Sequence, residues 1–177
     1  SLYITTTKGR SGKSAIVLGI MQLLLRDLHK VGFFRPVIDV AENTVKDHDI
    51  DLVLSHFYLG INYEDTYAYT MAEAKALITA GKQDELLENI LIKFKKLEEK
   101  CDFVLCEGTD FIRGNEAFTF EIISDIAAYL NSPTLIVTNA RKTPVDEVVA
   151  LTELAVEGLK EKSVDIIGTI VNRADKN

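Results

Sequence analysis

The chain has 177 residues, 47% hydrophobic and 27% charged, proportions that are typical of a globular domain and exclude a disordered or collagen-like protein. Its length fits one domain spanning residues 1–177. The net charge of −7 argues against nucleic acid or an anionic membrane as a partner, because both bind through an excess of Lys and Arg. The longest apolar run, Ala15–Met21, is too short to cross a bilayer. Two cysteines do not make a disulfide framework, which favours a cytoplasmic location.

Apolar runs of strand length alternate along the chain with longer segments that have helical periodicity. The predicted strands are Leu2–Thr6, Val31–Phe34, Phe103–Cys106, Leu135–Thr138 and Ile166–Val171. The predicted helices are Ala15–Lys30, Asp49–Phe57, Asp84–Lys100, Glu121–Leu130 and one that begins at Thr143. The strands lack polar alternation and helices separate them. The sequence therefore predicts an α/β fold of three layers, with a mainly parallel sheet and helices on both faces.

Two segments carry more local signals. Thr143 precedes Pro144 and Asp146, which predicts a helix with a threonine N-cap, proline at the first position and an acid at the third. Residues 39–70 are acidic and then rich in tyrosine, and apart from the short helix they are predicted to form a surface loop. Packing of the tyrosines onto the sheet is favoured there over a ligand site.

A predicted phosphate-binding loop lies between the first strand and the first helix. Residues 5–14 read TTTKGRSGKS. Gly9 and Gly12 let the backbone turn so that amide groups point inward, and the helix N-terminus adds a positive dipole. Lys13 is placed to reach the β- and γ-phosphates, and the Ser14 hydroxyl is placed for Mg²⁺. This order of elements predicts nucleotide binding. The alternative is a turn whose lysine and serine only cap the helix.

The loop departs from the usual motif at two places. Thr6 or Thr7 stands where the first glycine is expected, which leaves the path of the loop open. Lys8 lies five residues before Lys13, as in the deviant loop of the MinD/ParA ATPases, which this segment resembles. Those ATPases use the early lysine across a dimer interface. Because Arg10 replaces one of the usual glycines, a solvated surface lysine is favoured here.

Carboxylate side chains stand at the end of one predicted strand and at the start of one predicted helix, and they are candidate ligands at the same edge of the sheet. Glu107 ends a buried strand, so it falls in the crevice where parallel sheets bind ligands and is a candidate Mg²⁺ ligand opposite Ser14. A plain strand-end acid is the alternative. Asp47, Asp49 and Asp51 offer a further carboxylate, although their spacing equally suits a helix N-cap and a solvated face.

One amide completes the candidate site. Asn172 lies just beyond the last predicted strand, where its amide could donate to and accept from the edge of adenine. A turn residue is the alternative for this position.

Together these residues resemble the dethiobiotin-synthetase-like branch of P-loop proteins, and within it the N-terminal domain of long bacterial phosphate acetyltransferases. The similarity runs from Tyr3 to Asp175, and the more specific stretches are Phe-Phe-Arg-Pro at 33–36 and Cys-Glu-Gly-Thr-Asp at 106–110. The resemblance implies a P-loop NTPase-like fold. It also implies a nucleotide site that uses the loop lysine and hydroxyl, two acids for Mg²⁺ and an asparagine for adenine: Lys13, Ser14, Asp49, Glu107 and Asn172.

Arg35 marks a departure from the synthetases. Those enzymes have a lysine at this position, which serves the carboxylation chemistry, whereas a planar and permanently charged guanidinium cannot act as a compact or titrating charge. The departure weighs against dethiobiotin synthesis and favours the acetyltransferase branch.

In that branch the resemblance places acetyl transfer between coenzyme A and phosphate in a separate C-terminal domain of the same chain. It implies that residues 1–177 are a regulatory or assembly module that binds Mg-ATP or a related nucleotide and forms a homo-oligomer. Strand-like residues lie close to both ends, and we expect the N-terminal part of a longer chain. Two alternatives remain: an ATP-dependent ligase of the dethiobiotin synthetase or cobyrinate a,c-diamide synthase type, and a MinD/ParA-like dimeric switch.

Overall fold

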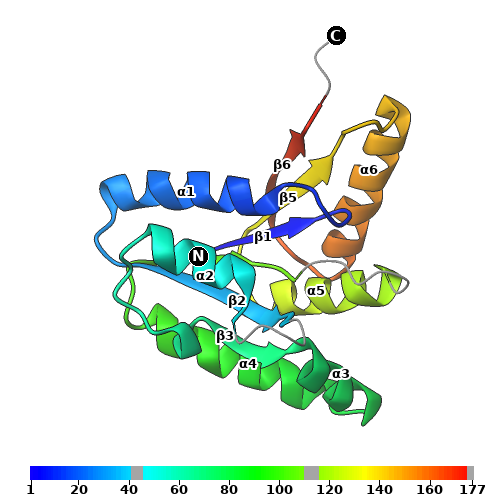
Figure 1. The fold of residues 1–177 in the computed structure, drawn as a ribbon. Coiled ribbons are helices and arrows are strands. Elements are labelled where there is room, and N and C mark those ends of the chain that lie inside the picture. Colours follow the sequence, from blue (N-terminus) through cyan, green and yellow to red (C-terminus); the bar gives the residue numbers. More distant parts are fainter. Residues whose placement is uncertain (41–45, 110–115, 175–177) are drawn as a thin grey trace.

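The structure is a computed structural model that describes residues 1–40, 46–109 and 116–174, with the helix residues 116–118 described by their backbone (Figure 1). Within these ranges one sheet contains six strands: β1 (Leu2–Thr6), β2 (Val31–Ile38), β3 (Tyr67–Thr70), β4 (Phe103–Glu107), β5 (Thr134–Asn139) and β6 (Ile166–Asn172). Their order is β3-β2-β4-β1-β5-β6, and each neighbouring pair is parallel. The predicted parallel α/β sheet is confirmed.

Helices cover both faces of the sheet, as predicted (Figure 1). One face carries α1 (Lys13–Asp27) and α2 (His48–His56). The other carries α3 (Met71–Thr79), α4 (Gln83–Glu98), α5 (Glu116–Leu130) and α6 (Val145–Glu161). Helices that lead toward β3 lie on the first face and helices that lead toward β6 on the second, which is what right-handed crossovers require. Among the described helices, none is long and apolar enough to cross a membrane.

The central strands bring the future site together. β4 lies between β2 and β1, and its side chains from Val104 to Glu107 are buried, as the unbroken apolar run predicts. Because all strands run in the same direction, the carboxyl ends of β1 and β4 meet at one edge of the sheet. The loop that follows β1 therefore starts beside Glu107, which pairs in register with Ile4.

Strand β2 is longer than predicted, because it continues through Arg35 and Pro36 to Ile38. Its pairing with β4 ends at Phe34, and beyond that point it pairs with β3 at Arg35, Val37 and Ile38. Pro36 therefore stands outside the register with β4, where its missing N–H breaks no ladder. The strand carries the Arg35 side chain up to the site.

Among the described residues of 39–70, the prediction was right for the helix and only partly right for the surface loop. Helix α2 forms, but a short 3₁₀ helix, η1 (Tyr63–Asp65), and the edge strand β3 follow where a loop was predicted. The rings of Tyr63 and Tyr67 pack edge to face with centroids 5.5 Å apart, in line with the favoured packing role, whereas Tyr58 is fully exposed and does not pack. Helix α3 was missed, although Thr70 and Glu73 form a capping box whose sequence signal is visible.

The start of α6 is also corrected. Pro144, not Thr143, is the N-cap residue, and no side chain caps the helix. The Thr143 hydroxyl instead donates to the carbonyl of Arg141 at 3.2 Å. Helix α5 begins earlier than predicted, at Glu116.

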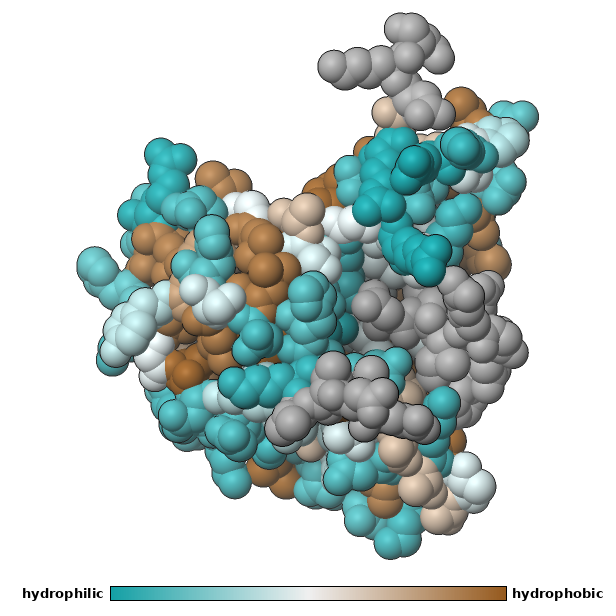
Figure 2. All heavy atoms as spheres, in the orientation of Figure 1, coloured by the Kyte–Doolittle hydropathy of each residue, from teal (hydrophilic) through white to brown (hydrophobic). Residues whose placement is uncertain are grey.

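Strand β6 departs from the expected burial on both faces. Its residues alternate in exposure, and Ile167, Thr169 and Val171 face solvent because β6 is an edge strand that packs against α6 on its other face. In Figure 2 the surface is hollowed between α1 and the edge of the sheet that β6 forms.

The two free cysteines differ in burial, which gives a testable prediction. Burial raises the pKa of the Cys106 thiol and, in a less enclosed site, that of Cys101. Since the thiolate is the form that reacts, we expect iodoacetamide at pH 8 to label Cys101 more slowly than an exposed thiol, and faster as the pH rises. Cys106 should react only after unfolding. Mass spectrometry of wild type and Cys101→Ser checks this, and labelling of Cys106 in the folded protein would contradict it.

Candidate functional site

The loop between β1 and α1 turns at two left-handed residues. Gly12, the N-cap of α1, has φ +81°, and an added Cβ there would lie 2.6 Å from Asn172 Nδ2. Arg10 has φ +58°, so an arginine rather than Gly9 makes the other turn. Gly9 has no positive φ, and a Cβ added to it would meet nothing within 4 Å. The predicted conformational role is confirmed for Gly12 and wrong for Gly9, whose part in cofactor binding stays a prediction.

Side chains from the ends of β5 and β6 clamp this loop. Asn139 Nδ2 and Arg173 Nη1 donate to the carbonyl of Arg10 at 3.1 and 3.0 Å. Asn172 Nδ2 donates to the carbonyl of Ser11 at 2.8 Å. The sequence signalled only Asn172, and for another purpose: its contact with adenine stays a prediction, while its amide nitrogen here fixes the loop. Nothing in the sequence marks Asn139 and Arg173, because their role depends on the register of strands far apart in the chain.

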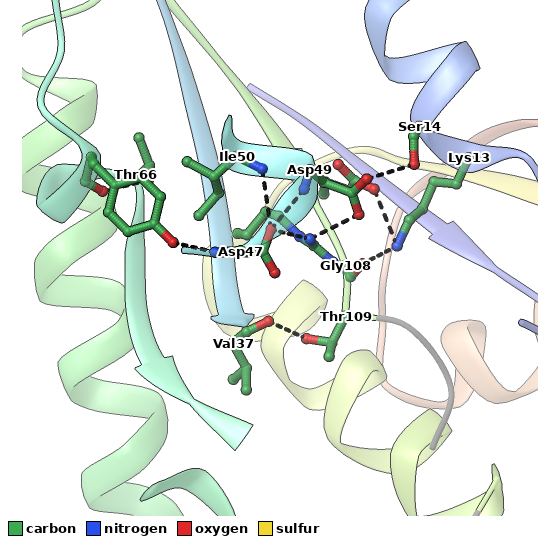
Figure 3. Close-up of polar contacts among 12 residues, drawn as sticks. Lys13, Ser14, Val37, Asp47, Asp49, Ile50, Thr66, Gly108 and Thr109 are labelled. Carbon is green, nitrogen blue, oxygen red and sulfur yellow. Dashed lines mark hydrogen bonds and ion pairs between the residues drawn. The ribbon is translucent and has the colours of Figure 1, made fainter. Parts of the chain in front are cut away.

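Lys13 is the first residue of α1 and lies at the end of β4 (Figure 3). Its side chain is 3% exposed, its Nζ donates to the carbonyl of Gly108, and it lies 3.4 Å from Oε1 of the fully buried Glu107. Gly108 itself packs closely against β1, since an added Cβ there would lie 2.9 Å from Tyr3 Oη. The structure thus pairs the loop lysine with the strand-end acid, a contact that was not predicted from the sequence; the phosphate contact of Lys13 and the Mg²⁺ contact of Glu107 stay predictions.

Ser14 and Asp49 also meet, as the resemblance implied (Figure 3). The Ser14 Oγ donates to Asp49 Oδ1 at 2.8 Å. Asp47, the alternative, is the N-cap of α2 and accepts from the backbone N–H of Asp49 and Ile50, both at 3.1 Å. Asp51 is exposed and lies 3.7 Å from Lys46, so it belongs to the solvated face. The acid that faces the phosphate loop from α2 is therefore Asp49.

Arg35 links the two aspartates, a contact that the sequence did not reveal. Its Nη1 donates to Asp47 Oδ1 at 2.5 Å and to Asp49 Oδ2 at 2.9 Å. The guanidinium is 3% exposed, so these ion pairs are shielded from water. Arg35 thus holds two carboxylates in place at the position where the resemblance expects the lysine of the synthetases.

The oxygen donors at this edge suit Mg²⁺ better than a transition metal. Ser14, Asp49 and Glu107 offer hydroxyl and carboxylate oxygens, which hard cations prefer. Within the part of the chain that the structure describes, no group of three or more His, Cys, Asp or Glu side chains could hold a metal by itself. A magnesium ion would thus need further oxygens, such as the phosphates of a nucleotide. The residues therefore fit that cation. The buried hydroxyl of Thr6 has no hydrogen-bond partner among the described residues, so it is available as a further polar group beside the loop.

Lys8 lies on the surface of its own chain. Its Nζ donates to Thr143 Oγ1 at 3.4 Å and lies 3.7 Å from Glu147 on α6, and its side chain is 32% exposed. This arrangement agrees with the surface lysine that the sequence favours.

Comparisons with known proteins agree with the resemblance seen in the sequence. Residues 1–177 match a family model described as AAA domain. The phosphate acetyltransferase of Nitratidesulfovibrio vulgaris is 53% identical over 174 residues, which are 98% of this chain and 25% of that protein. The ATP-dependent dethiobiotin synthetase of a Sulfurovum species is 27% identical over 169 residues, which are 93% of this chain and 78% of that enzyme. The chain thus spans about a quarter of the length of the phosphate acetyltransferase.

A solved structure extends the comparison to the fold. A ParA family ATPase from Chlorobium tepidum superposes with a TM-score of 0.52 at 15% identity, covering 99% of this chain and 75% of that one. At this identity the likeness concerns the fold alone, and it supports the P-loop NTPase-like architecture.

Proposed function

Because the chain belongs to the AAA domain family along its whole length, we propose that it binds a Mg²⁺-nucleotide, ATP or a related one, at the loop that ends in Lys13 and Ser14. The observation that carries this proposal is the convergence of four predicted residues at one edge of the sheet. Lys13 pairs with Glu107 at 3.4 Å, and Ser14 donates to Asp49 at 2.8 Å. Two elements far apart in the chain, β4 and α2, thereby supply acids to one loop.

Each of these residues has a distinct role in the proposal. The Lys13 ammonium binds the phosphates, supported by the N-terminus of α1. Ser14, Asp49 and Glu107 would hold Mg²⁺ through hydroxyl and carboxylate oxygens, and Asn172 would contact the base. When bound, Mg²⁺ offsets the charge of the phosphates. The carboxylates of Asp47, Asp49 and Glu107 also bring negative charge to this place, where they contact Lys13 and Arg35.

We further propose a regulatory or assembly role within a phosphate acetyltransferase. The support is the 53% identity to a protein of which this chain spans a quarter. Acetyl transfer between coenzyme A and phosphate would then belong to a C-terminal domain of the same chain, and the module would act as a homo-oligomer. The free thiols of Cys101 and Cys106 support a cytoplasmic setting.

A second candidate is an ATP-dependent ligase. It is favoured by the dethiobiotin synthetase of which this chain covers 78%. Arg35 argues against it, since its Nη1 donates to the carboxylates of Asp47 and Asp49. For a dimeric switch of the MinD/ParA type, Lys8 would have to leave Thr143, which precedes α6, and Glu147 of α6, and enter the partner's site.

Isothermal titration calorimetry tests nucleotide binding. We expect wild-type protein to bind ATP and ADP in Mg²⁺ buffer and to bind both more weakly in EDTA, because the acids at the loop would otherwise repel the phosphates. GTP in the same buffer compares the bases. Absence of heat with every nucleotide would contradict the proposal.

Enzyme assays separate the regulatory role from the ligase. We expect the purified chain to turn over neither diaminopelargonic acid with bicarbonate and Mg-ATP, nor acetyl-CoA with phosphate. Ring closure requires a compact charge where Arg35 stands, and a misplacement of about 1 Å can lower the rate on the order of a hundredfold. Turnover in the first assay would favour the ligase. Turnover in the second would show that no other domain is needed. We expect Arg35→Lys to show no turnover in the first assay either. Ring closure by this variant would show that the ligase site is otherwise intact.

A further inference from the structure

Arg35 is fixed from two sides at the centre of the site. Its backbone N–H donates to the carbonyl of Thr66 at 2.7 Å, and the residue pairs in register with Tyr67 of β3. Its Nη1 contacts a carboxylate oxygen of Asp47 and one of Asp49. The strand thus anchors the backbone while the buried guanidinium joins two acids of α2 and its N-cap.

The Asp49 carboxylate in turn orients the Ser14 hydroxyl. Its Oδ2 accepts from Arg35 and its Oδ1 accepts from Ser14 Oγ, so each oxygen has one defined donor. A serine hydroxyl has one proton and two lone pairs. With the proton directed to Asp49, the lone pairs of Ser14 Oγ remain available for a cation. Groups that orient a ligand in this way commonly set the metal affinity of a site.

Asp47 makes the arrangement rigid. The same Oδ1 that accepts from Arg35 also accepts from the backbone N–H of Asp49 and Ile50, which begins α2. Arg35 therefore holds both the start of the helix and the side chain that the helix presents. Among the described residues, the Asp49 carboxylate without Arg35 would keep only the hydrogen bond from Ser14.

We propose that Arg35 is a positioning residue for the Mg²⁺ that enters with the nucleotide, acting on Ser14 through Asp49. This role rests on the proposed function, and it deepens that function by assigning the metal dependence to a residue that does not bind the metal. The sign of the effect distinguishes positioning from charge. By charge alone a buried cation next to the site would weaken Mg²⁺ binding, so its removal would strengthen it. Positioning requires the opposite change.

The test compares ADP affinity in Mg²⁺ and in EDTA for wild type and for Arg35→Gln, by calorimetry. The ratio of the two affinities measures the metal dependence. We expect Arg35→Gln to lower this ratio about tenfold or more. Arg35→Lys keeps the charge and can reach one carboxylate, so it should give an intermediate ratio. Arg26→Gln, an exposed arginine in the last turn of α1, is the matched control and should leave the ratio unchanged.

A double variant shows whether the effect passes through Asp49. In an Asp49→Asn background, Arg35→Gln should cause no further fall in the ratio. An unchanged or increased ratio in Arg35→Gln would overturn the proposal, and so would an equal loss of affinity in Mg²⁺ and EDTA.

Thermal unfolding of each variant accompanies the titrations. If Arg35→Gln does not fold, Arg35→Lys decides: a ratio below wild type supports positioning, and one equal to wild type overturns it. Wild-type protein that binds no nucleotide in either buffer would overturn the proposed function itself. Wild-type binding that depends on Mg²⁺, and that Arg35→Gln retains, would overturn only the role of Arg35.

Discussion

Replacement of Lys13 by alanine is expected to lower the affinity for ATP and ADP at least about 30-fold. Loss of one partner in a buried, charged contact typically costs about 2–5 kcal/mol, and each 1.4 kcal/mol is a factor of ten in affinity. Lys13 is 3% exposed and lies between the phosphate loop and Glu107, so little water is available to replace its charge. Calorimetry of wild type and variant in Mg²⁺ buffer measures the change.

Lys8→Ala is the matched control for this prediction. Lys8 belongs to the same loop, but its side chain lies on α6 next to Glu147 and is partly exposed. Surface ion pairs contribute about 0–1 kcal/mol, so its removal should change nucleotide affinity by no more than about fivefold. Equal affinities for wild type and Lys13→Ala would mean that the loop does not hold phosphate. A larger loss for Lys8→Ala than for Lys13→Ala would favour the dimeric switch.

Gly12→Ala is expected to lower the free energy of unfolding by about 2–5 kcal/mol. A left-handed backbone costs a residue with a Cβ about 1–2 kcal/mol, and overpacking typically adds about 1–3 kcal/mol. Here the Cβ would lie 2.6 Å from Asn172 Nδ2 and 3.2 Å from Arg173 Nε, both of which clamp the loop. Urea denaturation at constant m-value measures the loss.

Gly9→Ala provides the comparison within the same loop. Gly9 has no positive φ and an added Cβ would meet nothing within 4 Å, so its stability should stay within about 0.5 kcal/mol of wild type. A Gly12→Ala protein as stable as Gly9→Ala would contradict the described loop conformation. Loss of nucleotide binding in Gly12→Ala with Gly9→Ala intact would show that the clamped shape of the loop is needed.

The sequence predicted the parts of the site that follow from strand order. Glu107 ends an apolar run, and Lys13 and Ser14 follow another, so a parallel sheet must bring them to one edge. Asp49 and Asp47 could not be told apart, because both stand at the start of one helix. The choice rests on Ser14, which donates to Asp49, whereas Arg35 contacts both acids and lies in the part of β2 beyond the predicted strand end at Phe34.

Other features lay beyond sequence reasoning for a different reason. The strand β3 is four residues long and half-buried at the sheet edge, so it lacks the apolar signal of the central strands. Asn139 and Arg173 contact the loop by their amide and guanidinium groups, and polar residues at strand ends usually read as turns. Arg10 adopts a conformation that glycine normally takes, which no pattern of residue types announces.

The clamp on the phosphate loop also has a consequence for the order of folding. The loop is complete by Ser14, but two of its clamping donors, Asn172 and Arg173, are more than 150 residues further along the chain. Contacts of such sequence separation form only after a large loss of chain entropy, and during synthesis they cannot form before the last strand has left the ribosome. A nascent chain that ends within β6 therefore contains the whole loop sequence without the contacts that shape it. The loop acquires its shape last, so the proposed nucleotide binding would report that the entire sheet has assembled.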